Sequence, residues 1–204
     1  MTGNAGGRFL PEDVFGYIYA VLFSASYREK YREFLRQDYP RVPIRPGSLL
    51  FQQLADLGRS LVDAHLLKFK PCKSARPGVR FVGPPSPTVG NIGKVLAHST
   101  QGVGEVRVSD QARFVGVSER AWNLHIGGYQ VLRKWLTDRK GQHLGAQEVD
   151  HYCLMAQAAD YTADLVERID CAIADAGGWP AAFSDAAAQA TVDASAEPAE
   201  DDDE

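Results

Sequence analysis

The stretch His125–Gly141, HIGGYQVLRKWLTDRKG, combines two adjacent glycines, an amphipathic segment and a basic end in seventeen residues. Gly127 and Gly128 tolerate backbone angles that other residues avoid, and they let another backbone or a phosphate come close. After them, apolar side chains recur at helical spacing, at Leu132, Trp135 and Leu136. We therefore expect a tight turn followed by a surface helix that ends near Gly141.

Three earlier segments have the apolar periodicity of helices. We expect the first from Pro11 to about Phe23, buried around most of its circumference. The second should run from a cap at Ser24 or Ser26 to about Gln37, and the third from Ser48 to about Leu67. Gly58, in the middle of the third, indicates close helix packing.

The second segment carries a basic stripe, and the connector after it is also basic. Arg28, Arg32 and Arg36 recur every four residues, and Glu29 and Glu33 could pair with Arg32 and Arg36. Residues 39–46, YPRVPIRP, contain three prolines that exclude helix, so Arg41 and Arg45 should lie on an extended path. The arginine stripe suits either a solvated helix face or a path for DNA phosphates.

The composition changes at Lys70. Four short β-like runs follow, Val79–Val82, Ile92–His98, Gly104–Val108 and Arg113–Val117. A long helix is expected from Gly145 to Asp170, with Val149, Tyr152, Ala156, Ala159, Ala163 and Val166 at alternating three-four spacing. The predicted fold class is α+β: a helical N-terminal half, a small, mostly antiparallel β-sheet in the middle, C-terminal helices and a disordered acidic tail.

The predicted domain organisation follows these changes of pattern. Residues 1–8 should be a flexible leader and 9–176 one domain, with helices in 9–69, the sheet in 70–118 and helices in 119–176. Residues 177–204 should be a disordered, solvated tail, since they are acidic and poor in large apolar residues. Trp179 and Phe183 are exceptions that could dock on the domain.

The net charge of −4 conceals a basic body. Eight of the 26 acidic residues lie in 185–204, so the other 18 face 22 Lys and Arg, a balance of about +4. This balance permits nucleic-acid binding without requiring it. The widely spaced Cys72, Cys153 and Cys171 favour a reduced protein, and no signal peptide or membrane span is evident, so we expect a cytoplasmic location.

Signatures of catalysis and cofactor binding are absent from the sequence. A DNA adenine methyltransferase needs an Asn/Asp-Pro-Pro-aromatic loop, whereas Pro84-Pro85 is preceded by Gly83. No phosphate-binding loop occurs, and the five histidines show no metal-ligand spacing beyond His151 and Cys153, which point apart on a helix. We predict that this chain is not itself an enzyme and needs no metal or cofactor.

Three blocks of the sequence, in the same order, resemble the C-terminal target-recognition domain of type ISP restriction-modification enzymes. They are PEDVFGYIYAVLFSASYREKYREFLRQDYPRVPI (residues 11–44), FQQLADLGRSLVDAHLL (51–67) and WNLHIGGYQVLRKWLTDRKG (122–141). The resemblance covers about residues 9–170 and is poorest from Lys73 to Asn91. It implies a parent polypeptide that carries nuclease, helicase-like ATPase and adenine-specific DNA methyltransferase parts. This chain could be a fragment, a separate recognition subunit or a split-gene product.

The resemblance implies sequence-specific recognition of duplex DNA, which would place a target adenine at a methyltransferase in the same polypeptide or in a partner. The sheet, its loops and the turn at Gly127–Gly128 would read bases, while basic side chains would contact phosphates. The candidate DNA-binding residues are His125, Gly127, Gly128, Tyr129, Gln130, Arg133, Lys134, Arg139, Lys140, Arg107, Gln111, Arg113, Asn123, Arg41, Arg45, Arg28, Arg32 and Arg36.

Two other classes of function remain open. The helical half could be a protein-interaction module that docks a methyltransferase or helicase partner without DNA affinity of its own. An enzyme that uses Cys or His is less well supported, since no nucleophile has an evident base. We expect Trp122 and Trp135 to be core residues and the cysteines to be inert.

Overall fold

The computed structural model describes residues 9–45, 48–69, 78–95 and 103–184. The chain divides into two compact units, one drawn from 1–62 and 165–204 and the other from 63–164. Two helices, α4 (Leu49–His65) and α7 (Ala146–Asp175), contribute residues to both units. The predicted leader, and the predicted tail from residue 185 onward, lie outside the described residues.

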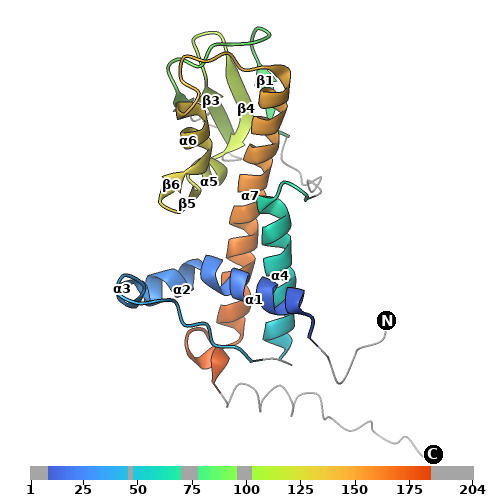
Figure 1. Ribbon diagram of the computed structural model, residues 1–204, viewed down its shortest axis with the longest axis vertical. Helices are drawn as coiled ribbons and strands as arrows, with labels where there is room; N and C mark the ends of the chain where they lie inside the picture. Colours follow the sequence, from blue (N-terminus) through green and yellow to red (C-terminus); the bar gives the residue numbers. More distant parts are fainter. Residues whose placement is uncertain (1–8, 46–47, 70–77, 96–102, 185–204) are drawn as a thin grey trace, which may run out of the picture. The chain divides into compact units, whose positions relative to one another are not determined.

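The first unit is helical and contains α1 (Pro11–Phe23), α2 (Ala25–Lys30), α3 (Arg32–Leu35) and parts of α4 and α7 (Figure 1). Pro11 begins α1, where its missing N–H costs nothing. The Ser48 hydroxyl accepts a hydrogen bond of 3.0 Å from the Phe51 N–H, which confirms the predicted cap of α4. Of the positions that the sequence predicts to face inward on α4, Leu50, Leu54, Leu57 and Leu61 are buried, whereas Val62 is only half-buried.

Two glycines bring α1 and α4 into backbone contact. A Cβ atom built on Gly58 would collide with the carbonyl oxygen of Gly16, and one on Gly16 would collide with that of Ala55. Beside this crossing, the rings of Tyr17 and Phe51 stack with their centroids 4.7 Å apart. The close packing predicted from Gly58 is therefore confirmed.

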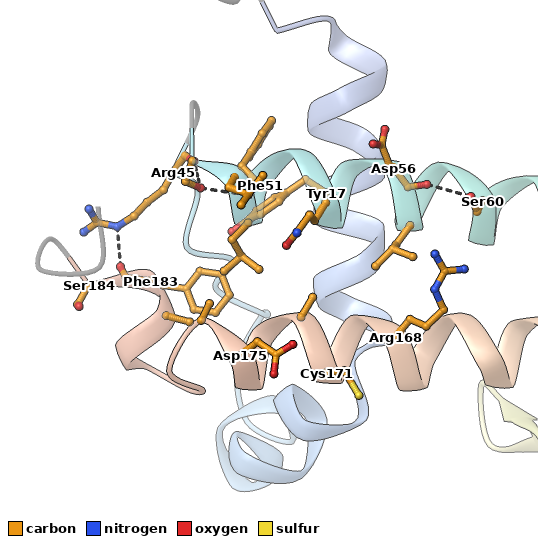
Figure 2. Close-up of a pocket in the computed structure, with 18 residues that line it drawn as sticks. Tyr17, Arg45, Phe51, Asp56, Ser60, Arg168, Cys171, Asp175, Phe183 and Ser184 are labelled. Carbon is orange, nitrogen blue, oxygen red and sulfur yellow. Dashed lines mark hydrogen bonds between the residues drawn. The ribbon is translucent and has the colours of Figure 1, made fainter. Parts of the chain in front are cut away.

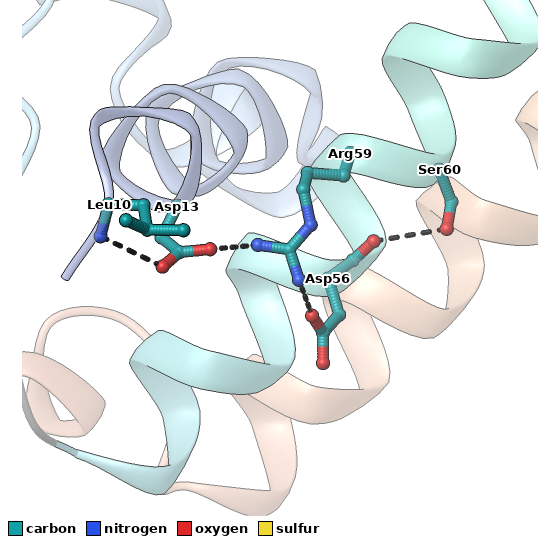
Figure 3. A network of polar contacts seen from close by, with 5 residues as sticks. All are labelled: Leu10, Asp13, Asp56, Arg59 and Ser60. Atoms are coloured by element: carbon teal, nitrogen blue, oxygen red, sulfur yellow. Dashed lines mark hydrogen bonds and ion pairs between the residues drawn. The ribbon is translucent and has the colours of Figure 1, made fainter. Parts of the chain in front are cut away.

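Arg59 of α4 links the same two helices through charge. It forms ion pairs with Asp13 of α1 and with Asp56 one turn earlier on α4 (Figure 3). Asp13 also accepts a hydrogen bond of 3.1 Å from the N–H of Leu10, which precedes α1. This network fixes the start of α1 against α4.

The segment after α7 folds back onto the helical unit, so the predicted start of the disordered tail at residue 177 was too early, and Trp179 and Phe183 are the exceptions that dock. Their rings stack at 4.2 Å, and the Trp179 ring lies 5.1 Å from that of Tyr27. The Trp179 indole N–H donates to the Ser26 hydroxyl at 3.0 Å. Residues 179–183 are thus part of the folded unit and end in the short 3-10 helix η1 (Ala181–Phe183).

The second unit contains a four-stranded antiparallel sheet of strand order β1-β4-β3-β2. The strands are β1 (Arg80–Val82), β2 (Gly93–Val95), β3 (Val103–Arg107) and β4 (Arg113–Ser118). Each of the four strands overlaps one of the predicted β-like runs. A short helix α5 (Glu119–Trp122), a two-stranded hairpin and α6 (Val131–Thr137) follow before α7.

The core of the second unit lies between the sheet, α6 and α7. Phe114 of β4 packs against Tyr152 of α7 with 4.1 Å between ring centroids, and Trp135 of α6 lies 5.3 Å from the same tyrosine. Leu132 and Leu136 of α6 are fully buried. Trp122 is buried and Trp135 packs against the same core, so both are core residues as predicted.

The predicted α+β fold class is confirmed, but three helices differ in detail. The helix expected from Ser24 to Gln37 is interrupted at Tyr31, whose φ of −103° and ψ of 19° leave the helical region while its ring packs against Tyr27. On α1, Phe15 is 56% exposed, so the expected burial around most of the circumference was wrong. The buried side of α1 is the narrow one that the glycine contact brings against α4.

The third difference concerns α7, which continues to Asp175 rather than ending near Asp170. Its predicted inward positions hold at Tyr152, Ala156 and Ala159, but Ala163 and Val166 are only half-buried. In the last turns the buried positions are instead Thr162, Leu165, Ile169 and Ile173. The prediction assumed one regular repeat, whereas α7 packs in two different units and the buried stripe shifts between them.

Candidate nucleic-acid interface

The paired glycines form the tip of a β-hairpin. Strands β5 (His125–Ile126) and β6 (Tyr129–Gln130) pair antiparallel across them. Gly127 and Gly128 have φ of +59° and +82°, the two positive values that a type I′ turn requires. A Cβ at either glycine would meet no atom within 4 Å, so the tip is open. The predicted turn is therefore present, but strand β6 lies between it and the helix α6.

The root of this hairpin is held firmly by hydrogen bonds. The Gln130 side-chain amide donates to the Trp122 carbonyl at 2.6 Å, and the Val131 N–H donates to the Leu124 carbonyl at 3.2 Å. The ring Nδ1 of His125 lies 2.7 Å from the Asn123 carbonyl oxygen. Since Trp122 is itself buried in the core, the tip is anchored by a rigid base.

Tyr129 and Lys134 lie beside the tip, and the next cation, Arg133, is on the same helix α6. The Tyr129 side chain is 61% exposed, and the Lys134 ammonium lies 5.7 Å from the centre of its ring. Lys134 also pairs with Asp138 at 2.6 Å. Arg133 is exposed, and its guanidinium makes no ion pair within the part of the chain that the structure describes. Of the two cations, Arg133 is therefore the better placed to neutralise an external phosphate.

Arg139 and Lys140, the two candidates after α6, differ in whether contacts within the protein occupy their side chains. The Arg139 guanidinium lies 3.7 Å from the centre of the Trp135 ring and pairs with Glu148 at 3.3 Å. A backbone hydrogen bond from Gly145, aided by Arg139, holds the pKa of the Glu148 carboxyl below its ordinary value. Arg139 thus helps to hold the start of α7, whereas Lys140 is exposed.

A second group of candidates lies at the turn between β3 and β4. Arg107 of β3 and Arg113 of β4 are directly opposite each other in the register of the two antiparallel strands. Gln111 is exposed in the turn that joins β3 to β4. Arg113 forms an ion pair of 3.1 Å with Glu105, while Arg107 is exposed. β4 runs from this turn to Ser118, immediately before α5, so about 17 Å of strand separates the group from the hairpin end of the sheet.

The five candidate arginines of the helical unit are largely occupied by contacts within the protein. Arg32 and Arg36 pair with Glu29 and Glu33, as the sequence predicted. Arg28 donates to the Phe23 carbonyl at 3.1 Å. The remaining two are Arg41, which lies 5.1 Å above the Phe34 ring, and Arg45, which donates to the Phe183 carbonyl at 2.6 Å. The break at Tyr31 also interrupts the arginine stripe.

A cavity of about 850 Å³ opens in the helical unit (Figure 2). Aromatic rings from Tyr17, Phe51 and Phe183 contribute to its wall, together with cationic and acidic side chains. Burial raises the pKa of Tyr17 to about 12. Cys171 lines the cavity, but among the residues that the structure describes no histidine lines it with the thiol as a base. The cavity offers neither a phosphate cradle nor a recognisable catalytic arrangement.

The other described groups that could carry chemistry do not form a site. Burial raises the pKa of the half-buried Cys153 thiol to about 11, which disfavours the reactive thiolate. Among the described residues, no three His, Cys, Asp or Glu side chains are grouped to hold a metal ion. No helix in the described ranges is long and apolar enough to cross a membrane.

The sequence interpretation overlooked Ile126, which pairs with Tyr129 across the hairpin. Side chains of directly paired residues lie on the same face of a two-stranded ribbon, so Ile126 and Tyr129 share one face and His125 and Gln130 the other. The signal was present, because two glycines between short β-prone runs are typical of a type I′ hairpin.

The structure defines an α+β fold that carries an open Gly-Gly hairpin followed by a helix with cationic side chains. The chain belongs to the family of Type ISP C-terminal specificity domains, whose model matches residues 2–168. A search of curated proteins gave no match. The family assignment agrees with the resemblance found in the sequence.

Three solved structures have a similar fold. A nuclease-deletion mutant of the Type ISP restriction-modification enzyme LlaGI, in complex with a DNA substrate mimic, has a TM-score of 0.55 and 19% identity over 79% of this chain. DrdV in a DNA complex gives 0.55 and 23% over 78%, and the ATP-dependent Type ISP enzyme LlaBIII bound to DNA gives 0.56 and 15% over 79%. The chain spans only 16%, 17% and 11% of these chains. At such identities the likeness shows the fold.

Proposed function

We propose that this chain is the DNA-reading part of a restriction-modification system and recognises a specific sequence in duplex DNA. Membership of the specificity-domain family supports this role, as does the fact that the three similar enzymes were solved with DNA or a DNA mimic. The observation that carries the proposal to particular residues is the open hairpin at Gly127–Gly128, followed by α6, on which Arg133 is exposed and makes no ion pair with any residue that the structure describes.

Two regions of the second unit would contact the DNA. The hairpin and the adjacent α6 would form one contact region, and the β3–β4 turn with Arg107, Gln111 and Arg113 would form another. Arg107 and Arg133 are exposed and suited to phosphates or guanine edges. The arginines of the helical unit are secondary candidates, because the contacts described above occupy them.

The reaction itself would belong to other parts of the system. We propose that the domain, within residues 9–176, places a target adenine at the pocket of a methyltransferase carried by the same polypeptide or by a partner. The small share of the related chains that this chain spans supports such a division of labour. On this account the chain supplies binding and register, and no catalytic group.

A salt-dependent binding titration tests whether the chain binds DNA through the proposed surface. We expect affinity for a mixed-sequence duplex to fall steeply with salt, because each neutralised phosphate releases about one counterion. Arg133→Ala should weaken binding and reduce the slope of log affinity against log salt by about one unit. Lys68→Ala, which removes an exposed cation outside the candidate set, is the matched control.

The outcome distinguishes two classes of function. A salt-dependent affinity that Arg133→Ala lowers more than Lys68→Ala supports the proposal. An absence of duplex binding at low salt would contradict it and favour the protein-interaction alternative. One observation favours that alternative: the α1 aromatic row of Phe15, Tyr19 and Phe23 has ring spacings of 5.8 and 4.8 Å, and Phe15 is largely exposed.

A further inference from the structure

The two faces of the β5–β6 hairpin differ in how far their side chains are occupied by contacts within the protein. On the face of His125 and Gln130, both side chains are hydrogen-bonded to the backbone of the hairpin's own root, at Asn123 and Trp122. One N–H of the Gln130 amide is therefore committed to the Trp122 carbonyl, which holds the amide against the hairpin root. Only its second N–H and its carbonyl oxygen remain for contact with a base edge.

The opposite face carries a largely exposed aromatic ring with one cation near it. Tyr129 is 61% exposed although it adjoins a rigid, hydrogen-bonded root, and the Lys134 ammonium is 5.7 Å from its ring centre. Ile126, half-buried on the same face, supports the ring from across the strand pair. Because Gly127 and Gly128 have no side chains, the tip is narrow enough for the ring to approach a groove floor.

We propose that Tyr129 is a wedge that inserts between adjacent base pairs of duplex DNA and stacks on one of them. The inference rests on the proposed DNA recognition and adds to it a contact that no polar group of the hairpin makes. Apolar and aromatic side chains on narrow projections unstack a base step in this way and kink the duplex. Lys134 would keep its contact with the ring and exchange its ion pair with Asp138 for a phosphate beside the opened step.

A wedge predicts selectivity for DNA that is easily unstacked. Opening a step costs less where the stack is already interrupted, as at a single abasic position or at a flexible pyrimidine–purine step. A groove contact made only through hydrogen bonds and charges lacks this preference. The preference should also be independent of salt, because stacking releases no counterions.

The experiment compares two mixed-sequence duplexes, identical except that one contains a single central abasic site. We expect wild-type protein to bind the abasic duplex about tenfold more tightly, in line with the contribution of an aromatic–base stack. Tyr129→Phe should keep this ratio, and Tyr129→Ala should reduce it to about one without changing the salt slope. Arg133→Ala should reduce the salt slope and keep the ratio. Tyr39→Ala, which removes an 87% exposed ring outside the proposed surface, should alter neither.

The possible outcomes separate this inference from the function on which it rests. Equal wild-type affinity for both duplexes, or a ratio that survives in Tyr129→Ala, overturns the wedge and leaves DNA recognition intact. No binding to either duplex overturns both. Since the Tyr129 ring is largely exposed and outside the core, its removal leaves the fold in place, which circular dichroism of the variant verifies.

Discussion

At the scale of single residues, two tyrosines of this protein have opposite hydrogen-bonding states. The Tyr152 hydroxyl is fully buried against the sheet and has no hydrogen-bond partner in the described part of the chain. The hydroxyl of Tyr27, also buried, donates to the Arg41 carbonyl at 2.9 Å. A buried polar group without a partner loses its hydration uncompensated, whereas a paired one does not.

This contrast gives a prediction for two matched substitutions. Tyr152→Phe should leave the free energy of unfolding unchanged or raise it by up to about 1 kcal/mol, because it removes an unsatisfied group. Tyr27→Phe should lower it by about 1 kcal/mol, because it breaks a hydrogen bond. Urea unfolding of both variants measures the difference. A clear loss of stability in Tyr152→Phe would show that its hydroxyl is satisfied, for instance by a buried water.

The buried thiol of Cys153 predicts how stability depends on alkaline pH. Burial raises its pKa to about 11 from an ordinary value of 9.0, so between these values the folded state binds more protons than the unfolded state. Stability present below pH 9 should therefore decline as pH rises toward 11. Chemical unfolding at several pH values should show a smaller decline for Cys153→Ala. An equal decline in both proteins would assign it to other groups, such as Tyr17, whose pKa is about 12.

At the scale of secondary-structure elements, the contact of α1 with α4 depends on the absence of two side chains. Gly58→Ala places a methyl group against the backbone carbonyl of Gly16, which cannot move without shifting α1. We expect the free energy of unfolding to fall by about 3 kcal/mol, as in severe overpacking. Gly78→Ala, where a Cβ meets nothing within 4 Å, is the control and should change stability by less than about 0.5 kcal/mol. Equal effects of Gly58→Ala and Gly78→Ala on urea unfolding would show that α1 moves away from α4 at little cost in free energy.

The elements also show how far the sequence determines the fold. Pro11, Ser48 and the β-like run Arg113–Val117 were sufficient to place α1, α4 and β4, because each signal acts within a few residues. The break at Tyr31 was not predictable in the same way. It accompanies the packing of the Tyr31 ring near Trp179, which lies about 150 residues away in the chain.

The candidate site was predictable to a similar extent. The glycine pair and the cations after it could be selected from composition and spacing. The sequence could not show which of these cations are free of contacts within the protein and so available to DNA. Only the structure shows that Arg139 is stacked on Trp135 and paired with Glu148, whereas Arg133 is exposed. Likewise, the bond from Gln130 to the Trp122 carbonyl depends on how α5 brings that carbonyl to the hairpin.

At the scale of the whole molecule, charge is divided unequally along the chain. Residues 185–204 carry eight acids and no Lys or Arg, so the net charge is −4 with them and about +4 without them. Long-range repulsion from these acids should oppose the approach of DNA, and salt should screen it. A chain that ends at Ser184 should therefore bind duplex DNA roughly threefold or more tightly at low salt, with the advantage lost near 1 M salt. An unchanged affinity at low salt would mean that the acids do not act on the DNA-binding surface.

Selection from a random duplex pool tests the central claim, that this chain recognises a DNA sequence, most directly. The chain would be mixed with the pool at low and at physiological salt, and the retained duplexes would be sequenced. We predict enrichment of one short motif, which Tyr129→Ala and Arg133→Ala recover less efficiently than wild type. Retention of the pool without any enriched motif, or no retention at either salt, would contradict the account.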